Sequence, residues 1–359
     1  MSAPAVAVVL PPREAFSPDA EGGIGPAIRL LARYPSGFSV RVYGMTVARP
    51  FHEVPFVPVR PALVLGDAAR RYAVGMARAL AAAPPALLEV HDRPDLALHL
   101  KRHFSAPVLL VLSRDPQAMR RARAAADRAA LIAALPGVAT ASEWLRTRLL
   151  EGMETPARPV TVLPAGLDLE HLPLPQTREP TLLFAGPLTA ESGVDAFVAA
   201  CARVLPRLPG WRADIIATDR SAPETPFHTL LRERAAAAGV RMAGWHSREE
   251  ARHALAGCGM AVVPSRWPEP VGLAALEALG CGAPLLCSMR GALAERAEGV
   301  AELIDPDDPE SFAAAMLALA RDPPRRAALS EAGRAKAAGF AAAEAAARLD
   351  ALRSSLLGA

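Results

Sequence analysis

Short apolar segments alternate with longer, alanine-rich amphipathic segments along most of the chain. In the first half, the apolar segments are residues 6–10, 38–43, 87–91, 108–112, 138–142 and 160–163. Segments that suit helices, such as 68–82 and 116–135, separate several of them. The alternation predicts an α/β protein in which helices connect parallel strands and cover the sheet.

A proline-rich segment of mixed charge, residues 169–180, interrupts this alternation near the middle of the chain. Beyond it the apolar segments resume at 181–185, 213–217, 240–242, 260–264 and 284–288. A chain of 359 residues exceeds what one compact core accommodates. We therefore expect an N-terminal Rossmann-like domain at 1–172, a C-terminal one at 173–338, and a final alanine-rich helix at 339–359.

The charge and the cysteines narrow the class of protein. A net charge of +3 is only mildly basic, which argues against a duplex-DNA-binding protein. The four cysteines form no CxxC pair, so we expect buried free thiols in a reducing compartment. No uncharged stretch approaches the ~20 residues that span a bilayer, and no basic segment precedes the first apolar run. We expect a cytoplasmic protein.

The strongest local signal lies in residues 264–295. An apolar strand runs into a proline-rich loop, a helix begins near Val271, and glycines at 280 and 282 end it before a second apolar strand. Open α/β sheets bind ligands beyond the carboxyl ends of their strands, where this loop lies. The N–H groups around Gly272 and Leu273, together with the positive end of the helix dipole, suit a pyrophosphate.

Two carboxylates stand at this helix. Glu269 precedes it and Glu277 lies inside it, which places them roughly 12 Å apart along the helix axis. Glu277 has apolar neighbours on both sides in sequence, and a carboxylate in such a setting needs partners, for which ribose hydroxyls are suitable. A surface position on an amphipathic helix is the alternative for Glu277 taken alone.

The pattern P-S-x-x-x-E-P-x-G-L-x-x-L-E-A-x-x-x-G-x-P, which begins at Pro264, resembles the donor-site signature of the retaining glycosyltransferases of family four, or glycosyl transferases group 1. Weaker likenesses to this family extend over nearly the whole chain, at residues 22–25, 142–145, 166–168, 183–193, 305–312 and 319–333. The resemblance implies the GT-B fold, in which two Rossmann-like, doubly wound parallel-sheet domains face a cleft. It also implies that the C-terminal helix returns to the N-terminal domain.

The resemblance further implies roles for particular residues. Glu269 would contact the transferred sugar and act as the catalytic residue, and Glu277 would contact the nucleotide ribose. The remaining donor-binding residues would be Gly186, Arg266, Pro270, Gly272 and Leu273. The acceptor-side residues would be Gly22, Gly23, Gly25, His91, Arg114 and Asp115. For the glycines an ordinary turn is the alternative. For His91 the alternatives are a contact with the donor sugar and a strand-end turn.

The chain departs from the family pattern at three places. Pro187 and Ser192 stand where the family places the Arg and Lys that clamp the pyrophosphate. The strand that ends His-Asn-Asp-Pro in similar bacterial members continues here as Ser113-Arg114-Asp115-Pro116, and Ala165 replaces the hinge Asn. If the site is used, Arg266, Arg290 and Arg114 are the candidates in the sequence for a compensating cation. The alternative is that all three are solvated and that N–H groups at the helix end alone hold the pyrophosphate.

The reaction expected from the resemblance is transfer of a hexose-type sugar from a nucleotide diphosphate donor to a glycan, lipid-linked or small-molecule acceptor, with retention and without a metal or cofactor. A role in cell envelope polysaccharide biosynthesis would follow. Two alternatives stay open. A catalytically degenerate GT-B protein would bind a nucleotide or glycan, or partner an active transferase, and a sugar-nucleotide epimerase would isomerise the donor itself.

Three weaker patterns complete the sequence-based hypotheses. Arg120, Arg121, Arg123 and Arg128 suggest a basic amphipathic helix that contacts the inner face of a membrane, or else a solvated face. Asp305-Pro306-Asp307 has the D-x-D form of a metal site, but a helix cap at Asp308 is the favoured interpretation. His99 and His103 are spaced as metal ligands on one helix face, and we expect an exposed face there.

Overall fold

The computed structural model describes residues 3–19, 23–173, 177–219 and 224–358. The chain forms two compact units, one of Met1–Gly166 with Ala342–Ala359 and the other of Leu167–Ala341. The first unit thus ends at Gly166, upstream of the boundary expected at residue 172, and it includes the last helix. Each unit has its own parallel sheet.

The sheet of the first unit has seven parallel strands in the order β3-β2-β1-β4-β5-β6-β7. The strands are β1 (Ala5–Val9), β2 (Ser39–Met45), β3 (Phe56–Val59), β4 (Leu87–His91), β5 (Val108–Leu112), β6 (Gly137–Thr140) and β7 (Thr161–Val162). The helices are α1 (Ile24–Leu31), α2 (Ala68–Ala81), α3 (Pro94–His103), α4 (Ala125–Ala134), α5 (Glu143–Leu150) and α13 (Ala342–Leu357), with the short 3₁₀ helix η1 (Pro116–Ala118).

Helices cover both faces of this sheet. One core joins the sheet to α2, α3 and α4, and the opposite core joins it to α1 and α13. Strands β4 and β5 are almost completely buried, which explains their continuous apolar sequence.

The sheet of the second unit has six parallel strands in the order β10-β9-β8-β11-β12-β13. The strands are β8 (Glu179–Gly186), β9 (Arg212–Ala217), β10 (Val240–Trp245), β11 (Cys258–Val263), β12 (Leu285–Ser288) and β13 (Glu302–Ile304). The helices are α6 (Val194–Val204), α7 (Pro226–Ala237), α8 (Arg248–Gly257), α9 (Leu273–Gly280), α10 (Leu293–Ala297), α11 (Pro309–Ala320) and α12 (Pro323–Ala338). Two 3₁₀ helices, η2 (Leu169–His171) and η3 (Leu205–Arg207), complete the unit.

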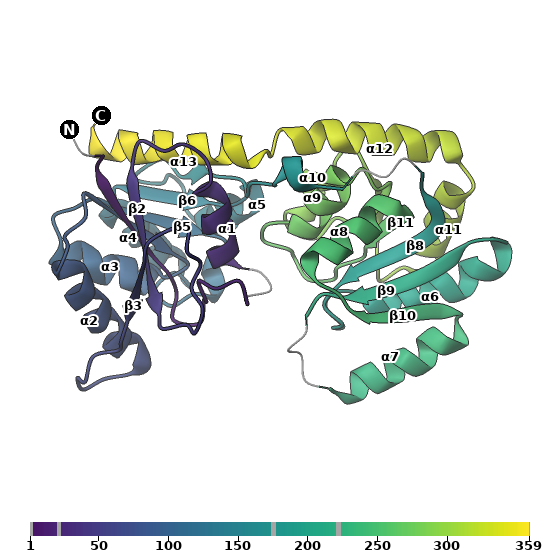
Figure 1. Cartoon of the computed structure of the whole chain (residues 1–359), viewed down its shortest axis with the longest axis horizontal. Coiled ribbons are helices and arrows are strands. Elements are labelled where there is room, and N and C mark those ends of the chain that lie inside the picture. Colours follow the sequence, from purple (N-terminus) through teal and green to yellow (C-terminus); the bar gives the residue numbers. More distant parts are fainter. Residues whose placement is uncertain (1–2, 20–22, 174–176, 220–223, 359) are drawn as a thin grey trace. The chain divides into compact units, whose positions relative to one another are not determined.

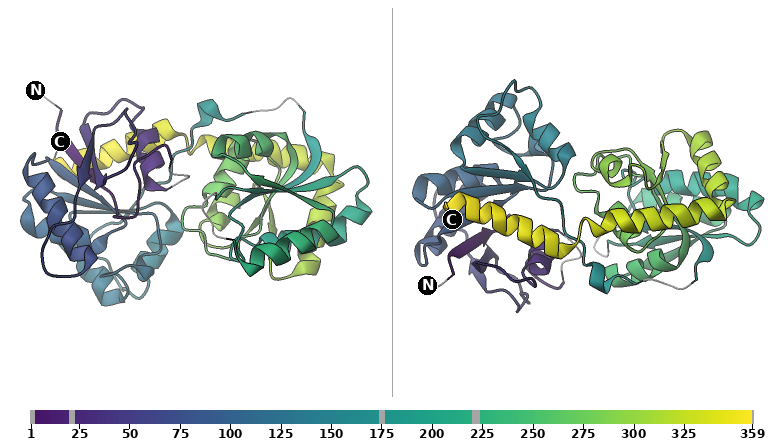
Figure 2. Two further views of the ribbon diagram at one scale, coloured as in Figure 1. Left: turned by 60° about the horizontal axis from the view of Figure 1, so that its bottom comes forward. Right: turned by 90° about the horizontal axis from the view of Figure 1, so that it is seen from above.

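This second sheet also lies between two layers of helices (Figure 2). One core contains α6 and α11, and the other contains α8, α9 and α10. Both sheets are therefore doubly wound. All four cysteines are buried and free, as the sequence predicts.

The predicted basic helix at 116–135 is wrong in its first half. Only 125–134 is α-helical, and η1 is followed by irregular backbone in which Arg121 has a φ of 68°. The left-handed conformation of Arg121 interrupts the helix before residue 125. Arg128 is buried and donates to the backbone carbonyls of Leu149 and Arg123, so it forms no part of a basic surface.

Candidate functional site

The strand order of the second sheet reverses between β8 and β11. Chain connections leave these two neighbouring strands toward opposite sides, which is where doubly wound sheets bind ligands. Residues 187–193 follow β8, and residues 264–272 follow β11. The expected donor-binding residues all belong to this edge, since Gly186 ends β8 and the others lie in the loop after β11 or at the start of α9.

The two loops at this edge pack against each other and are joined by hydrogen bonds. Gly193, with a φ of 74°, precedes α6, and a Cβ at this position would lie 1.9 Å from the Pro264 carbonyl oxygen. No residue but glycine fits there without moving backbone. The backbone N–H groups of Arg266 and Trp267 donate to the Glu191 carbonyl at 2.8 and 3.1 Å. The loop after β8 therefore sets the position of the loop that carries Glu269.

Arg266 and Arg290, two of the three cations expected to compensate for the missing clamp, are both paired with aspartates. The Arg266 guanidinium lies 2.7 Å from Asp195 and 2.8 Å from Asp307. Arg290 lies 3.2 Å from Asp307 and 3.4 Å from Asp305. Their charges are thus balanced locally, and the D-x-D carboxylates serve as their partners. Arg266 holds the loops together through these contacts.

Glu269 is fixed by both its backbone and its side chain. Its backbone forms a parallel bridge with Gly291, and its carbonyl accepts from the Ala292 N–H at 2.7 Å. Its Oε1 accepts from the Ser265 hydroxyl at 3.1 Å. Burial raises the pKa of Glu269, and the Ser265 hydrogen bond opposes this only in part. A carboxyl group with a raised pKa at a ligand-binding edge is a candidate for chemistry.

Helix α9 begins at Leu273, directly after Gly272 in the left-handed conformation. Among the residues that the structure describes, no side chain caps this helix with a hydrogen bond. Arg296 lies against the turn and donates from Nε to the Val271 carbonyl at 3.2 Å. The first N–H groups of α9 therefore point toward the same edge as Glu269, where an anion would complete their hydrogen bonds.

Glu277 has partners that the sequence-based reasoning missed. Its Oε1 accepts from Arg248 Nε at 2.7 Å and from Arg252 Nε at 2.8 Å. Both arginines belong to α8, whose N-terminus is fixed by a capping box between Ser247 and Glu250. The carboxylate side chain is only 14% exposed. The i, i+4 spacing of the two arginines on one helix was the available signal, but its target lies on another helix.

In the first unit, His91 lies at the end of β4 and is held by a buried carboxylate. Its Nε2 is 2.8 Å from Glu89 Oε1, and Glu89 Oε2 accepts from Arg353 Nη2 of α13 at 2.8 Å. Burial alone would raise the pKa of Glu89, but the Arg353 charge and His91 outweigh it and lower the pKa to about 2. The C-terminal helix is thereby tied to the strand that carries His91.

Arg114, the third candidate for a compensating cation, also has carboxylate partners. It lies 3.3 Å from Asp92 and 3.3 Å from Glu14. Asp92, which has a φ of 50°, accepts from both the N–H and the hydroxyl of Ser113. Asp115 caps η1 and pairs with Arg148 at 3.0 Å, so its contacts are structural.

The glycine-rich loop of the first unit is described only in part. Gly22 lies outside the described residues, whereas Gly23 and Gly25 are described. Gly23 precedes α1, and the Glu14 carboxylate accepts from the Ile24 N–H at 2.6 Å. The N-terminus of α1 therefore already faces a carboxylate, which disfavours a phosphate of the donor at this position.

The histidine and aspartate patterns do not form a metal site. Within residues 3–19, 23–173, 177–219 and 224–358, no three His, Cys, Asp or Glu side chains gather as metal ligands. The His99 and His103 rings lie 4.2 Å apart, and His103 Nδ1 is 2.8 Å from the His99 carbonyl. Asp308 caps α11 by accepting from the Ser311 N–H at 3.1 Å, as the sequence predicts.

The two doubly wound, all-parallel units have the GT-B fold, as the sequence-based resemblance implied. Sucrose-phosphate synthase from Thermosynechococcus elongatus matches with a TM-score of 0.82 at 19% identity, over 98% of this chain and 99% of that one. HepE from Anabaena, solved with UDP-glucose, matches with a TM-score of 0.74 at 13% identity, over 98% of this chain and 99% of that one.

Sequence comparison finds a family model and curated relatives that match part of the chain. Residues 179–322, which include Glu269 and Glu277, match the family model described as glycosyl transferases group 1. A lipopolysaccharide core biosynthesis mannosyltransferase, LpsB of Rhizobium meliloti, is 34% identical over 160 residues, which cover 42% of this chain and 44% of LpsB. A glycogen synthase of Mycobacterium tuberculosis is 33% identical over 144 residues, 38% of this chain and 33% of that protein. The matches span less than half of these curated relatives.

Proposed function

We propose that the protein is a glycosyltransferase that moves a hexose-type sugar from a nucleotide diphosphate donor to an acceptor, with retention at the anomeric carbon. The observation that carries the proposal is the pair Glu269 and Glu277, held on either side of the α9 N-terminus at the edge where the second sheet reverses. The family match to residues 179–322 supports the same assignment.

The donor would lie along this edge. Glu269 would accept hydrogen bonds from the hydroxyls of the transferred sugar, and the free Leu273 N–H at the start of α9 would donate to the diphosphate. Glu277 would accept from the ribose, with Arg252 fixing the orientation of its carboxylate. In this scheme neither a metal nor a cofactor is required.

Arg248 is our candidate for the cation that compensates for Pro187 and Ser192. It is the first residue of α8 and thus follows the carboxyl end of β10 directly. Its side chain is 37% exposed, whereas that of Arg252 is 18% exposed. Arg252 can therefore keep Glu277 paired while Arg248 turns toward a bound diphosphate.

The relatives support a class of donor and a cellular role. HepE was solved with UDP-glucose, which supports a nucleoside diphosphate hexose as the donor. LpsB is a lipopolysaccharide core mannosyltransferase, which supports a glycan or lipid-linked acceptor in cell envelope polysaccharide biosynthesis. The fixed imidazole of His91 would serve on the acceptor side.

We also propose a peripheral contact with the inner face of the cytoplasmic membrane. Among the described residues, no helix is long and apolar enough to cross a bilayer. Leu63 and Leu65 are 99% and 90% exposed, on the segment that precedes Asp67. Arg120 pairs with Asp67, so the exposed Arg121 lies near the same segment. Cosedimentation with anionic vesicles should be lost in a Leu63→Ser, Leu65→Ser variant, and unchanged binding would refute the contact.

Donor turnover tests the proposed function. The protein is incubated with UDP-, GDP- and ADP-hexoses, with and without glycan acceptors, and nucleoside diphosphate release is measured. Release that Glu269→Gln suppresses is the expected result, and NMR of the product should show the donor's anomeric configuration. Isomerised donor in the absence of acceptor would indicate an epimerase, and binding without release would indicate a degenerate protein.

A further inference from the structure

A pocket lies in the same unit, at the opposite edge of the sheet from Glu269. It has a volume of about 950 Å³. Its walls include the first residues of β8, Pro284 just before β12, Trp211 just before β9, and one side of α12. Because these positions are at the amino ends of parallel strands, the pocket is separate from the proposed donor site.

Three arginines line this pocket, namely Arg178, Arg326 and Arg334. Arg178 donates to the carbonyls of Ala256 at 2.7 Å and Cys281 at 3.2 Å, and Arg326 donates to the Leu319 carbonyl at 2.9 Å. Within the described part of the chain, none of the three forms an ion pair with a carboxylate. Carbonyl oxygens satisfy hydrogen bonds but leave the charge uncompensated, in contrast to the paired Arg266 and Arg290.

The side chains of Arg178 and Arg334 both pack against Gly282. Its φ is 69°, and a Cβ there would lie 2.9 Å from Arg178 Nη2 and 2.9 Å from Arg334 Cδ. Ser330 donates from its hydroxyl to the Gly282 carbonyl at 2.6 Å, which joins α12 to this turn. The last glycine of the pattern that begins at Pro264 thus allows a close approach of two cationic side chains, far from Glu269 along the strands.

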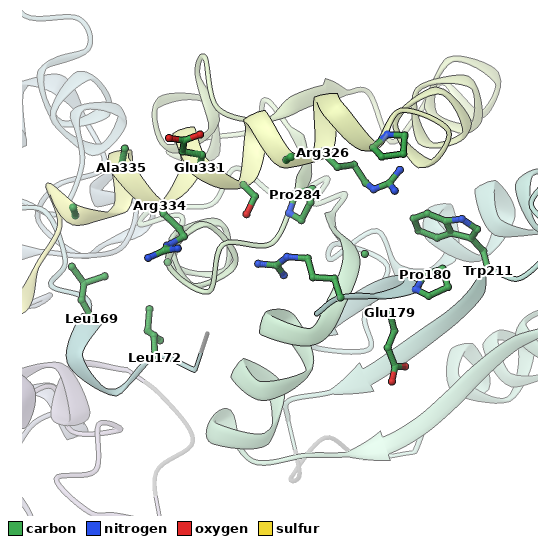
Figure 3. Close-up of a pocket in the computed structure, with 17 residues that line it drawn as sticks. Leu169, Leu172, Glu179, Pro180, Trp211, Pro284, Arg326, Glu331, Arg334 and Ala335 are labelled. Carbon is green, nitrogen blue, oxygen red and sulfur yellow. The ribbon is translucent and has the colours of Figure 1, made fainter. Parts of the chain in front are cut away.

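The carboxylates that line the pocket do not neutralise it. Glu179 is paired with Arg212, which is not among the lining residues. Figure 3 shows the Glu331 carboxylate on the side of α12 opposite to Arg334, and the Glu179 carboxylate directed away from α12. Burial lowers the pKa of both Arg178 and Arg326, so a bound anion would stabilise their charged forms.

The remaining walls suit a carbon-bearing ligand rather than a bare anion. Trp211 lies beside Arg326, whose guanidinium carbon is 5.1 Å from its ring, and Pro180 and Pro284 add apolar surface. Several lining residues on α12 are small, namely Ala327, Ser330 and Ala335. A volume of about 950 Å³ is also much larger than a single phosphate ion requires.

We propose that this pocket binds a sugar phosphate, with the phosphate on Arg178 and Arg334 and the sugar toward Trp211 and Pro284. Guanidinium groups bind phosphate oxygens in pairs, and the apolar face of a sugar ring packs on an indole. The ligand would contact the turn that ends α9, whose opposite end faces the proposed donor site. The proposal does not depend on the proposed transferase activity.

Calorimetric titration of the full chain with a hexose 6-phosphate tests the proposal. Arg334→Glu should weaken binding at least about tenfold, because an exposed guanidinium becomes a repelling carboxylate. Arg203→Glu is the matched control, since Arg203 is exposed on α6 outside the pocket and has the same change of charge. Ala335→Trp, which fills the pocket without changing its charge, should also abolish binding. This second variant tests the pocket independently if Arg334→Glu does not fold.

Hydrogen exchange locates the bound ligand. Protection on α12 and at the turn around Gly282 is the expected result, whereas protection confined to residues 264–273 would place the ligand at the donor edge and overturn the proposal. Equal affinity for inorganic phosphate and the hexose 6-phosphate would show that the sugar contributes nothing to binding, which would overturn the proposal. Tighter binding of a nucleoside monophosphate than of the hexose 6-phosphate would overturn the proposal, because it would identify the ligand as a nucleotide. Unchanged affinity in Arg334→Glu and Ala335→Trp would exclude the pocket.

Discussion

Arg252 Nη2 lies 2.7 Å from Glu277 Oε1, and the same oxygen also accepts from Arg248. One carboxylate oxygen on α9 therefore joins two guanidiniums of α8. Removing the carboxylate leaves two like charges beside each other at the proposed donor site, whereas removing Arg248 alone leaves Glu277 with one partner. Both changes should weaken nucleotide binding, but for different reasons.

Glu277→Ala should weaken binding of the donor nucleoside diphosphate by ~1.5–3 kcal/mol, because a hydrogen bond to a charged group is lost. Calorimetry measures the change, and circular dichroism checks the fold. Glu298→Ala, an exposed change in the same unit, is the control and should bind as the wild type does. An affinity for the nucleotide that stays the same in folded Glu277→Ala would disprove the ribose contact.

Arg248→Ala should weaken binding of the nucleoside diphosphate more than about tenfold and leave binding of the nucleoside unchanged, because the arginine acts on the phosphates. Adding the family's cations in Pro187→Arg, Ser192→Lys should then tighten binding by less than about tenfold, since a cation already serves. If the added cations tighten diphosphate binding by much more than tenfold and Arg248→Ala does not weaken it, no residue compensates for the family's Arg and Lys.

Glu269→Gln should reduce turnover while nucleoside diphosphate binding stays near the wild-type value. Because burial raises the pKa of Glu269, the ionised form is lost at a higher pH than for an exposed glutamate. If the carboxylate form is the active one, kcat should fall as the pH is lowered through that raised pKa, and Glu269→Gln should not show this pH-dependent fall. Equal losses of turnover and diphosphate binding would mean that Glu269 supports the loop instead.

Arg353→Met should destabilise the first unit by about 3–5 kcal/mol, because it removes the guanidinium that pairs with the buried Glu89 carboxylate and leaves only His91 beside it. Since the folded pKa of Glu89 is lowered from 4.5 to about 2, the pair contributes its full stability above pH 4.5 and loses it as the pH falls toward 2. Urea unfolding across this range measures both effects. Arg348→Met, an exposed change on α13, should cost little, and an equal cost for both variants would contradict the account.

Sequence patterns predicted most of the fold because buried parallel strands are continuous apolar runs. Strands β4 and β5 agree with the predicted bounds for this reason. Strands β3 and β13 were not predicted, since both lie at sheet edges, are short, and contain a proline or a charged residue. The alanine-rich periodicity of 116–135 concealed the irregular backbone around Arg121.

The site was predictable only where its residues are close in sequence. The motif around Glu269 and Glu277 is local, so its spacing shows in the sequence. The partners of Glu277 and the fit of Gly193 against Pro264 join segments more than 20 residues apart, and no local pattern records such contacts. For the same reason, the ion pairs of Arg266 with Asp195 and Asp307 were found only in the structure.

The most direct test of the central claim is calorimetric titration of the full chain with a panel of UDP-, GDP- and ADP-hexoses. The account predicts one saturable site for at least one of them, weakened by Glu277→Ala and by Arg248→Ala but not by Glu298→Ala. If neither the wild type nor Pro187→Arg, Ser192→Lys binds any of these donors while both remain folded, the protein is not a nucleotide-sugar-dependent glycosyltransferase.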